Sequence, residues 1–303
     1  MRQQEIQYLE YREYIASQES VNKAMIALLA ATRLTANALQ TTASSMMPLS
    51  VIYPQVEHIE RFNLRTDVAR DLLLTSDEHL TSAAVTYALA THEEFVQGSI
   101  ALLGRIGMAL RYKGKPLTAK QVRPFDMHEV LFESTGQAPP HAWLQCFALI
   151  REMRNCVVHS GKLASPWLEK ALRDMSADAV SEWKRLTRRP PQTLIDRGRI
   201  VPIPEHVFAA FAITKRLGRE INWSFARTIS AKDWSSIAVR DYAECVRRKA
   251  DSDGRETRLR NSSSWRRGLI GYARQYYGSL GLNESDLIAA AQREGLWTLM
   301  STP

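Results

Sequence analysis

The residues whose types could do chemistry lie in one short segment, "REMRNCVVHSG", which spans residues 151–161. Asn155 and His159 are four residues apart and would share one face of a helix. Arg154 precedes His159 by five residues, about 140° around a helix, so it would flank that face. Arg151 would extend the face one turn before Asn155. This polar ridge of Arg151, Arg154, Asn155 and His159 is costly to bury unless an anion or another polar surface meets it.

The polar ridge suits cleavage of an RNA phosphodiester by its own 2′-hydroxyl. A histidine can accept or return a proton near neutral pH, and an arginine stays charged and can neutralise the phosphorane. An asparagine can orient the imidazole or hold a phosphate oxygen, and no metal or other cofactor is needed. One helix supplies one histidine, whereas the reaction uses a base and an acid. Two copies across a two-fold axis would supply both, so a composite site in a homodimer is predicted.

The run "RNCVVH" from Arg154 to His159, followed by Ser160 and Gly161 near the end of an apolar helix, resembles the arginine-to-histidine signature of HEPN domains. HEPN domains are all-helical and often dimerise through the helix that carries this signature. Many are metal-independent RNA endonucleases of toxin–antitoxin, abortive-infection and CRISPR systems. The resemblance implies that Arg154 and His159 are catalytic and that Asn155 supports them. It also implies a toxin or defence effector that acts on RNA and is controlled by an antitoxin or trigger protein.

The same loose spacing occurs at two other places in the chain. Arg123 and His128 enclose Pro124 in a segment that reads as a loop, and the stretch from Arg199 to His206 contains two prolines. Proline interrupts a helix because it lacks the amide hydrogen and clashes with the preceding turn. Neither pair is therefore expected to share a helix face.

Helical periodicity dominates the chain and predicts an all-α fold. The expected architecture is a HEPN-like helical bundle with a long N-terminal helix, a minor β-hairpin and a C-terminal helical extension. The hairpin is expected around residues 196–198, where β-prone residues flank Asp-Arg-Gly. Three consecutive segments are predicted: an N-terminal arm (1–66), the HEPN-like core (67–228) and a basic C-terminal region (229–303).

Several helices can be placed from caps and spacing. The helix that begins near Ser76 is expected to bury residues from Leu80 to Leu110, Tyr87 among them, and to end at Gly114. Residues 3–46 are expected to form one long helix or a broken pair. The other expected helices cover residues 126–134, 140–161, 231–248, 263–277 and 284–294, and one more follows Pro204.

The composition of the chain excludes several kinds of protein. Lysine and arginine outnumber aspartate and glutamate by 40 to 32, which favours a polyanionic partner such as RNA. The three cysteines have no paired spacing, so neither a disulfide framework nor a zinc site is predicted. The longest apolar runs are far shorter than the roughly 18 residues of a membrane span. We therefore expect a soluble, cytoplasmic chain without membrane contact. No glycine loop for phosphate and no nucleophile elbow is present.

Two further groups of residues are weaker candidates. Glu93 and Glu94 could face the polar ridge and orient Arg154 or His159, although such a pair also fits a solvated helix face. The basic C-terminal region could grip RNA by phosphate contacts and base stacking, or could be a solvated face beside core aromatics. Its candidate RNA-binding residues are Arg247, Arg248, Arg258, Arg260, Trp265, Arg266 and Arg267.

Three other interpretations remain open at this stage. The polar ridge could be a surface or interface histidine with arginines near a helix C-terminus, where cations are favoured. A HEPN-like domain could hold RNA or a nucleotide without cutting it. The chain could also be a helical regulatory or scaffold protein whose basic C-terminal region binds DNA or a protein.

Overall fold

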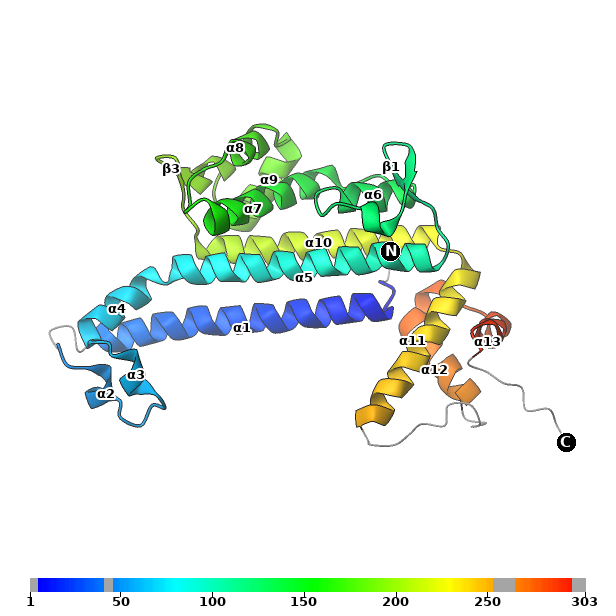
Figure 1. The fold of residues 1–303 in the computed structure, drawn as a ribbon, viewed down its shortest axis with the longest axis horizontal. Coiled ribbons are helices and arrows are strands. Elements are labelled where there is room, and N and C mark those ends of the chain that lie inside the picture. The colour runs from blue at the N-terminus through cyan, green and yellow to red at the C-terminus, as the bar shows by residue number, and fades with distance from the viewer. Residues whose placement is uncertain (1–4, 41–45, 253–264, 296–303) are drawn as a thin grey trace. The chain divides into compact units, whose positions relative to one another are not determined.

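The computed structural model describes residues 5–40, 46–252 and 265–295 and is built almost entirely of helices (Figure 1). The predicted all-α fold class is confirmed. In chain order the elements are α1 (Leu9–Gln40), α2 (Leu49–Ile52), α3 (Ile59–Phe62), α4 (Thr66–Thr75), α5 (Asp77–Arg105), β1 (Leu110–Tyr112), β2 (Lys115–Leu117), η1 (Ala119–Gln121), α6 (Met127–Ser134), α7 (His141–His159), α8 (Pro166–Arg173), α9 (Ala177–Thr187), η2 (Pro191–Leu194), β3 (Ile195–Asp196), β4 (Arg199–Ile200), α10 (Pro204–Thr228), α11 (Ala231–Ser252), α12 (Trp265–Tyr277), η4 (Gly278–Leu280) and α13 (Glu284–Arg293).

The chain divides into two compact units, and each is assembled from separate stretches of sequence. Unit 2 consists of Ala16–His92 and Pro140–Arg216, and unit 1 contains the remaining stretches. Helices α1, α5 and α10 each contribute residues to both units. These interleaved units differ from the three consecutive segments expected from the sequence, a division that stays a prediction.

Unit 1 has a core rich in aromatic rings. Tyrosines recur at every third position from the residue before α1 into its first two turns, and all three are buried: Tyr8, Tyr11 and Tyr14. Asn222 of α10 binds the segment that precedes α1. Its side-chain amide donates to the Ile6 carbonyl at 2.7 Å, and its side-chain oxygen accepts from the Ile6 amide at 3.0 Å. A buried amide side chain thus satisfies both backbone groups of Ile6, as burial requires.

In unit 2, α8 and α9 pack against α7, which carries the polar ridge. Serine side chains cap both helices: Ser165 accepts from the amide of Leu168 at the start of α8, and Ser176 caps α9 in the same way. Gln145 of α7 accepts hydrogen bonds from both the amide and the hydroxyl of Ser176, at 3.0 and 2.7 Å. Trp183 of α9 is fully buried. Capping and burial therefore hold α7 in place.

Most of the expected helices are present close to their predicted bounds. The first expected helix is observed as α1, and the remaining ones as α6, α7 and α10 to α13. The hairpin predicted around residues 196–198 is confirmed as β3 and β4, which pair antiparallel.

The predicted end of the long helix at Gly114 is wrong. Helix α5 ends at Arg105, and the following residues form a second hairpin, β1–β2, with Lys113 and Gly114 as its two-residue turn. Both turn residues have positive φ, at 52° and 77°, as a tight hairpin favours. Glu133 of α6 stabilises this turn by accepting from both amides at 2.7 Å.

The predicted buried face of this helix is also partly wrong. Ala84 and Phe95 are buried as expected, whereas Tyr87 is 57% exposed. The buried positions include Val85, Ala88 and Leu89 instead. This part of α5 is rich in alanine, so the sequence offers little contrast between its faces, and packing partners decide which face is covered.

We predict that Gly218→Ala destabilises the protein although alanine favours a helix over glycine by about 1 kcal/mol. A Cβ at Gly218 in α10 would lie 2.5 Å from the ring of Tyr14. That ring is fixed because it is buried and stacks on Phe95 at 4.3 Å between centroids. Overpacking of this kind costs about 1–3 kcal/mol, which urea denaturation will measure.

Gly98→Ala is the matched control for this prediction. Gly98 lies inside α5, and a Cβ there would have no atom within 4 Å. The control should raise the free energy of unfolding by about 0.5–1 kcal/mol. Equal stabilisation by both alanines would show that Tyr14 does not restrict α10.

We predict a pH-dependent stability from Asp241 of α11. Its carboxylate accepts a hydrogen bond from the Leu9 amide at 2.7 Å and another from the Tyr277 hydroxyl. Burial nevertheless raises the pKa of Asp241 from 3.8 to about 6. Because the folded pKa is the higher one, this group's stabilisation is full at low pH and is lost as the pH rises through the folded pKa.

The comparison uses Asp241→Asn, which is neutral at every pH. The stability of the wild type relative to this variant should fall by about 2 kcal/mol between pH 4 and pH 7. Urea denaturation of both proteins across this range measures the difference. Parallel pH profiles would contradict the prediction.

Candidate functional site

Helix α7 ends abruptly just after the polar ridge. The amides of Ser160 and Lys162 both donate to the carbonyl of Cys156, at 3.1 and 3.0 Å. Gly161, between them, has a φ of 55°, which glycine adopts without strain. His159 is therefore the last residue of the helix, and the chain turns away directly after it.

The three predicted catalytic residues all lie on α7, as expected. His159 is exposed, whereas Arg154 and Asn155 are partly buried. The apolar residues of the helix face the core of unit 2, namely Cys146, Phe147, Leu149, Ile150, Met153 and Cys156. The His159 imidazole at the end of α7 is thus open to solvent, whereas the Arg154 guanidinium, five residues earlier, is partly buried.

Glu152 is a residue of this site that the sequence reasoning missed. One of its carboxylate oxygens lies 3.7 Å from Nε of Arg151, and the other accepts from the Asn155 amide at 3.5 Å. The side chains of Arg151 and Glu152 are only 11% and 14% exposed. The first half of the polar ridge is therefore not an open cationic surface, because an acid between the arginine and the asparagine balances the charge. The sequence signal was available, since Glu152 stands next to Arg151.

Two further cations gather where α7 ends. Lys162 forms an ion pair with Glu78 at the start of α5. Arg199 of β4 donates to the carbonyl of Gly161 at 2.9 Å, two residues after His159. The amide of Ile200 donates to the carbonyl of Lys162 at 2.8 Å, so the β3–β4 hairpin is joined to this turn. No sequence spacing could have revealed Arg199, because it is 38 residues from Gly161.

The two rejected matches to the loose spacing do not form helix faces. Arg123 lies in a loop, and His128 is buried on α6. Arg199 lies on β4, whereas His206 lies on α10 and accepts a hydrogen bond from the Ile203 amide. Burial, helped by the charge of Arg189, lowers the pKa of His206 to about 4. This histidine is a neutral core residue.

The acids of α5 take different positions. Glu93 is partly buried and Glu94 is exposed. Their predicted role as orienting partners of the polar ridge stays a prediction. His92 is fully buried and its ring lies 5.3 Å from that of Phe147, edge to face, which fits a packing role.

The basic C-terminal region is only partly described. Arg258 and Arg260 lie outside the described residues. Arg247 and Arg248 of α11 pair with Glu244, and Arg266 of α12 pairs with Glu284.

The aromatic part of this region belongs to the core. Trp265 is 4% exposed, and its ring contacts that of Tyr242 edge to face at 5.5 Å. Its side chain is therefore not placed to stack on a base, which corrects the sequence expectation for this residue. Arg267 is exposed on α12, so its guanidinium is open to solvent. Phosphate contacts by these arginines stay a prediction.

Cys146 lies in an environment that disfavours the reactive thiolate. Cys146 is buried, its thiol donates to the Ala179 carbonyl at 3.4 Å, and burial raises its pKa to about 12. Within residues 5–40, 46–252 and 265–295, no three His, Cys, Asp or Glu side chains form a group that could hold a metal ion. Among the same residues, no helix is both long enough and apolar enough to cross a membrane.

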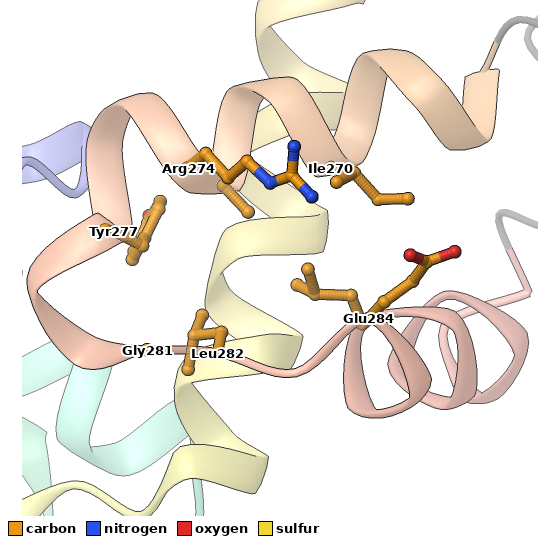
Figure 2. Close-up of a pocket in the computed structure, with 9 residues that line it drawn as sticks. Ile270, Arg274, Tyr277, Gly281, Leu282 and Glu284 are labelled. Carbon is orange, nitrogen blue, oxygen red and sulfur yellow. The ribbon is translucent and has the colours of Figure 1, made fainter.

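The polar ridge does not line either of two hollows in the structure. One of about 120 Å³ lies between α12 and α13 in unit 1, and Figure 2 shows Arg274 and Glu284 on its opposite walls. It is smaller than the roughly 300 Å³ at which ligand pockets begin. The other is a groove of about 440 Å³ between α1 and α4 in unit 2. The His159 imidazole is thus displayed on a surface of the described chain and lies in neither hollow.

Comparisons with known proteins do not assign the chain to a family. A scan against protein-family models and searches of the curated proteins and of the solved structures found no match for the chain.

Proposed function

We propose that this chain is a metal-independent endoribonuclease whose site forms where two copies of α7 meet. The observation that carries the proposal is the exposed imidazole of His159 at the end of a helix that also holds Arg154. A histidine buried inside one subunit could not reach a phosphodiester. Arg199 lies at the same helix end, where it binds a backbone carbonyl rather than an acid, and its charge would add to the attraction for a phosphate backbone.

The reaction would need a proton acceptor and a proton donor. The imidazole of one His159 would take the proton of a ribose 2′-hydroxyl, and the 2′-oxygen would form a bond to phosphorus. The bond from phosphorus to the 5′-oxygen would then break, and His159 of the partner copy would protonate that oxygen. The products would be a 2′,3′-cyclic phosphate and a 5′-hydroxyl. Arg154 would neutralise the charge that builds on the phosphorane oxygens.

The neighbours of the polar ridge fit supporting roles in this scheme. Glu152 holds Arg151 and Asn155 through its two oxygens. With its charge balanced in this way, Arg151 would position the ridge rather than bind phosphate. Asn155 would orient a ring or a phosphate oxygen from its place one turn before His159.

The wider setting follows from the resemblance of Arg154 to His159 to the HEPN signature. On that basis the chain would be a cytoplasmic toxin or antiviral defence effector, and an antitoxin or trigger protein would hold its activity in check. These assignments belong to the proposal and fail with it if the chain does not cleave RNA.

His159→Ala and Arg154→Ala should each lower RNA cleavage by about 10²- to 10⁴-fold, because each removes a group that acts in the transition state. The measurement is cleavage of total RNA in EDTA by the purified proteins, with end-group analysis for the cyclic phosphate. Circular dichroism and light scattering should show unchanged helicity and oligomeric state. Full activity in either variant would rule out its role.

His141→Ala is the matched control, because His141 is an exposed histidine at the other end of the same helix. This variant should cleave RNA at the wild-type rate. If the wild type binds RNA but does not cleave it, the polar ridge is an anion cradle and the enzymatic proposal is wrong.

If the site is shared between two copies, a wild-type subunit should lose its cleavage activity when it pairs with an inactive subunit. When His159→Ala protein is mixed at four to one with a fixed amount of wild type, the cleavage rate should fall to about one-fifth after subunit exchange, because only dimers of two intact copies would act. The rates are measured before and after exchange at 37 °C. An unchanged rate would place the complete site within a single chain.

A further inference from the structure

The segment around the β1–β2 hairpin of unit 1 concentrates positive charge. Residues 95–125 contain six lysines and arginines and no aspartate or glutamate. The first of the six, Arg105, pairs with Glu10. The other five are all exposed and lie on the hairpin or between it and α6. These five cations and the exposed Phe125 are called the basic hairpin surface: Arg111, Lys113, Lys115, Lys120, Arg123 and Phe125.

Hydrogen bonds fix the backbone that carries the basic hairpin surface. The hairpin packs against α6 (Figure 1), where the Ser134 hydroxyl accepts from the Arg111 amide at 2.9 Å. Glu133 accepts from the amides of both turn residues, as described above. A capping box closes η1, the short helix that carries Lys120. The cations therefore stand on a preformed scaffold, which lowers the cost of ordering them around a ligand.

The acids of α6 and its N-terminus offset this charge only in part. Residues 111–133 contain five cations and three acids. Asp126 accepts from the Tyr112 hydroxyl at 2.8 Å, and Glu133 is engaged by the turn amides. Glu129 is exposed, and its charge acts on Lys113. Of the residues that the structure describes, no acid forms an ion pair with any of the other four cations of the surface.

The placement of the cations favours a flexible polyanion over a flat anionic surface. In the hairpin, Arg111 is opposite Pro116 and Tyr112 is opposite Lys115. Because neighbouring residues of a strand point to opposite faces, Arg111 and Lys115 lie on different faces of the hairpin. A bilayer would meet one face at a time. A single strand of nucleic acid carries a phosphate on every nucleotide and can follow the surface from one face to the other.

A single exposed ring beside these cations suits an unpaired base. Phe125 is 65% exposed and follows Arg123 by two residues. An aromatic ring stacks on any base because every base has a π-face, while neighbouring cations hold the phosphates. Within residues 88–157, all of which the structure describes, no other large apolar side chain is exposed. Attachment to a membrane needs a larger apolar face than this.

We propose that the basic hairpin surface binds single-stranded nucleic acid, with its cations on the phosphates and Phe125 stacked on a base. The proposal does not rest on the proposed function, because binding here involves neither the polar ridge of α7 nor cleavage. The recognised groups are a phosphate and the face of a base, which RNA and DNA strands share.

Fluorescence anisotropy with a labelled oligothymidylate tests this proposal on the full chain. A thymidine strand lacks the 2′-hydroxyl that the proposed cleavage uses, so it is bound without being cut. The combined variant Lys115→Gln, Lys120→Gln and Arg123→Gln should bind about 100-fold more weakly than the wild type at 0.1 M salt, because three phosphate contacts are lost. The slope of log Kd against log salt concentration should decrease by about 2. Circular dichroism should show wild-type helicity, since the three side chains are exposed.

The stacking contact has its own variants. Phe125→Ala should weaken binding about 10-fold with an unchanged salt dependence, because it removes a ring and no charge. Phe125→Trp should bind at least as tightly as the wild type. Equal binding by Phe125→Ala and the wild type would show that no base stacks there. An oligouridylate bound by His159→Ala protein should behave like the oligothymidylate, and binding confined to one of the two strands would contradict the recognition of shared groups.

Lys170→Gln, Arg173→Gln and Lys184→Gln together form the matched control. They also remove two exposed lysines and one exposed arginine, from α8 and α9 of unit 2. This control should bind the oligothymidylate like the wild type. Equal weakening in both combined variants would show that binding follows the net charge alone and would overturn the proposal. So would a wild type that binds phosphatidylserine vesicles through the hairpin cations but does not bind the strand.

The outcome is separable from that of the proposed function. If the hairpin variants lose the oligothymidylate but the wild type does not cleave RNA, the binding surface stands and the nuclease proposal fails. If the wild type cleaves RNA while the hairpin variants bind the strand normally, the nuclease proposal stands and this surface is wrong.

Discussion

The candidate site depends on the contacts that the Glu152 carboxylate makes with Arg151 and Asn155. The carboxylate lies between Arg151 and Asn155 on the half-covered side of α7, where the side chains of Arg151 and Glu152 are almost removed from water. A guanidinium in such surroundings is costly without an acid beside it. By balancing this charge within the helix itself, Glu152 lets α7 pack against its neighbours and still carry polar groups toward its open end.

The end of α7 is set by backbone hydrogen bonds and by contacts from elsewhere in unit 2. The amides of Ser160 and Lys162 donate to the carbonyl of Cys156, and the helix ends at His159. Arg199 then binds the carbonyl of Gly161, and Lys162 reaches Glu78. A single imidazole is thus left exposed among cations on a surface that is not enclosed. This geometry suits a site that a second molecule completes better than a pocket within one chain.

The chain separates its two kinds of surface along the sequence. Residues 1–160 carry a net charge of −1 and expose leucines on α1 and α4, whereas residues 161–303 carry a net charge of +9. Apolar burial favours association with protein, and basic charge favours association with a phosphate backbone. The proposed homodimeric ribonuclease would use both, on different surfaces, so that the second copy does not compete with the substrate.

The sequence by itself determined the helical fold class, the bounds of α6 and α7, the hairpin at residues 195–200 and the placement of Arg154, Asn155 and His159 on one helix. These features depend on caps, prolines and helical spacing, which are local. Tertiary structure alone decided that Tyr87 is exposed, that Trp265 is buried and that Arg199 lies at the end of α7. It also decided the interleaving of the two units. The physical reason is that burial and charge balance depend on which distant segment covers a side chain, and alanine-rich helix faces or residues 38 positions apart carry no local signal of that partner.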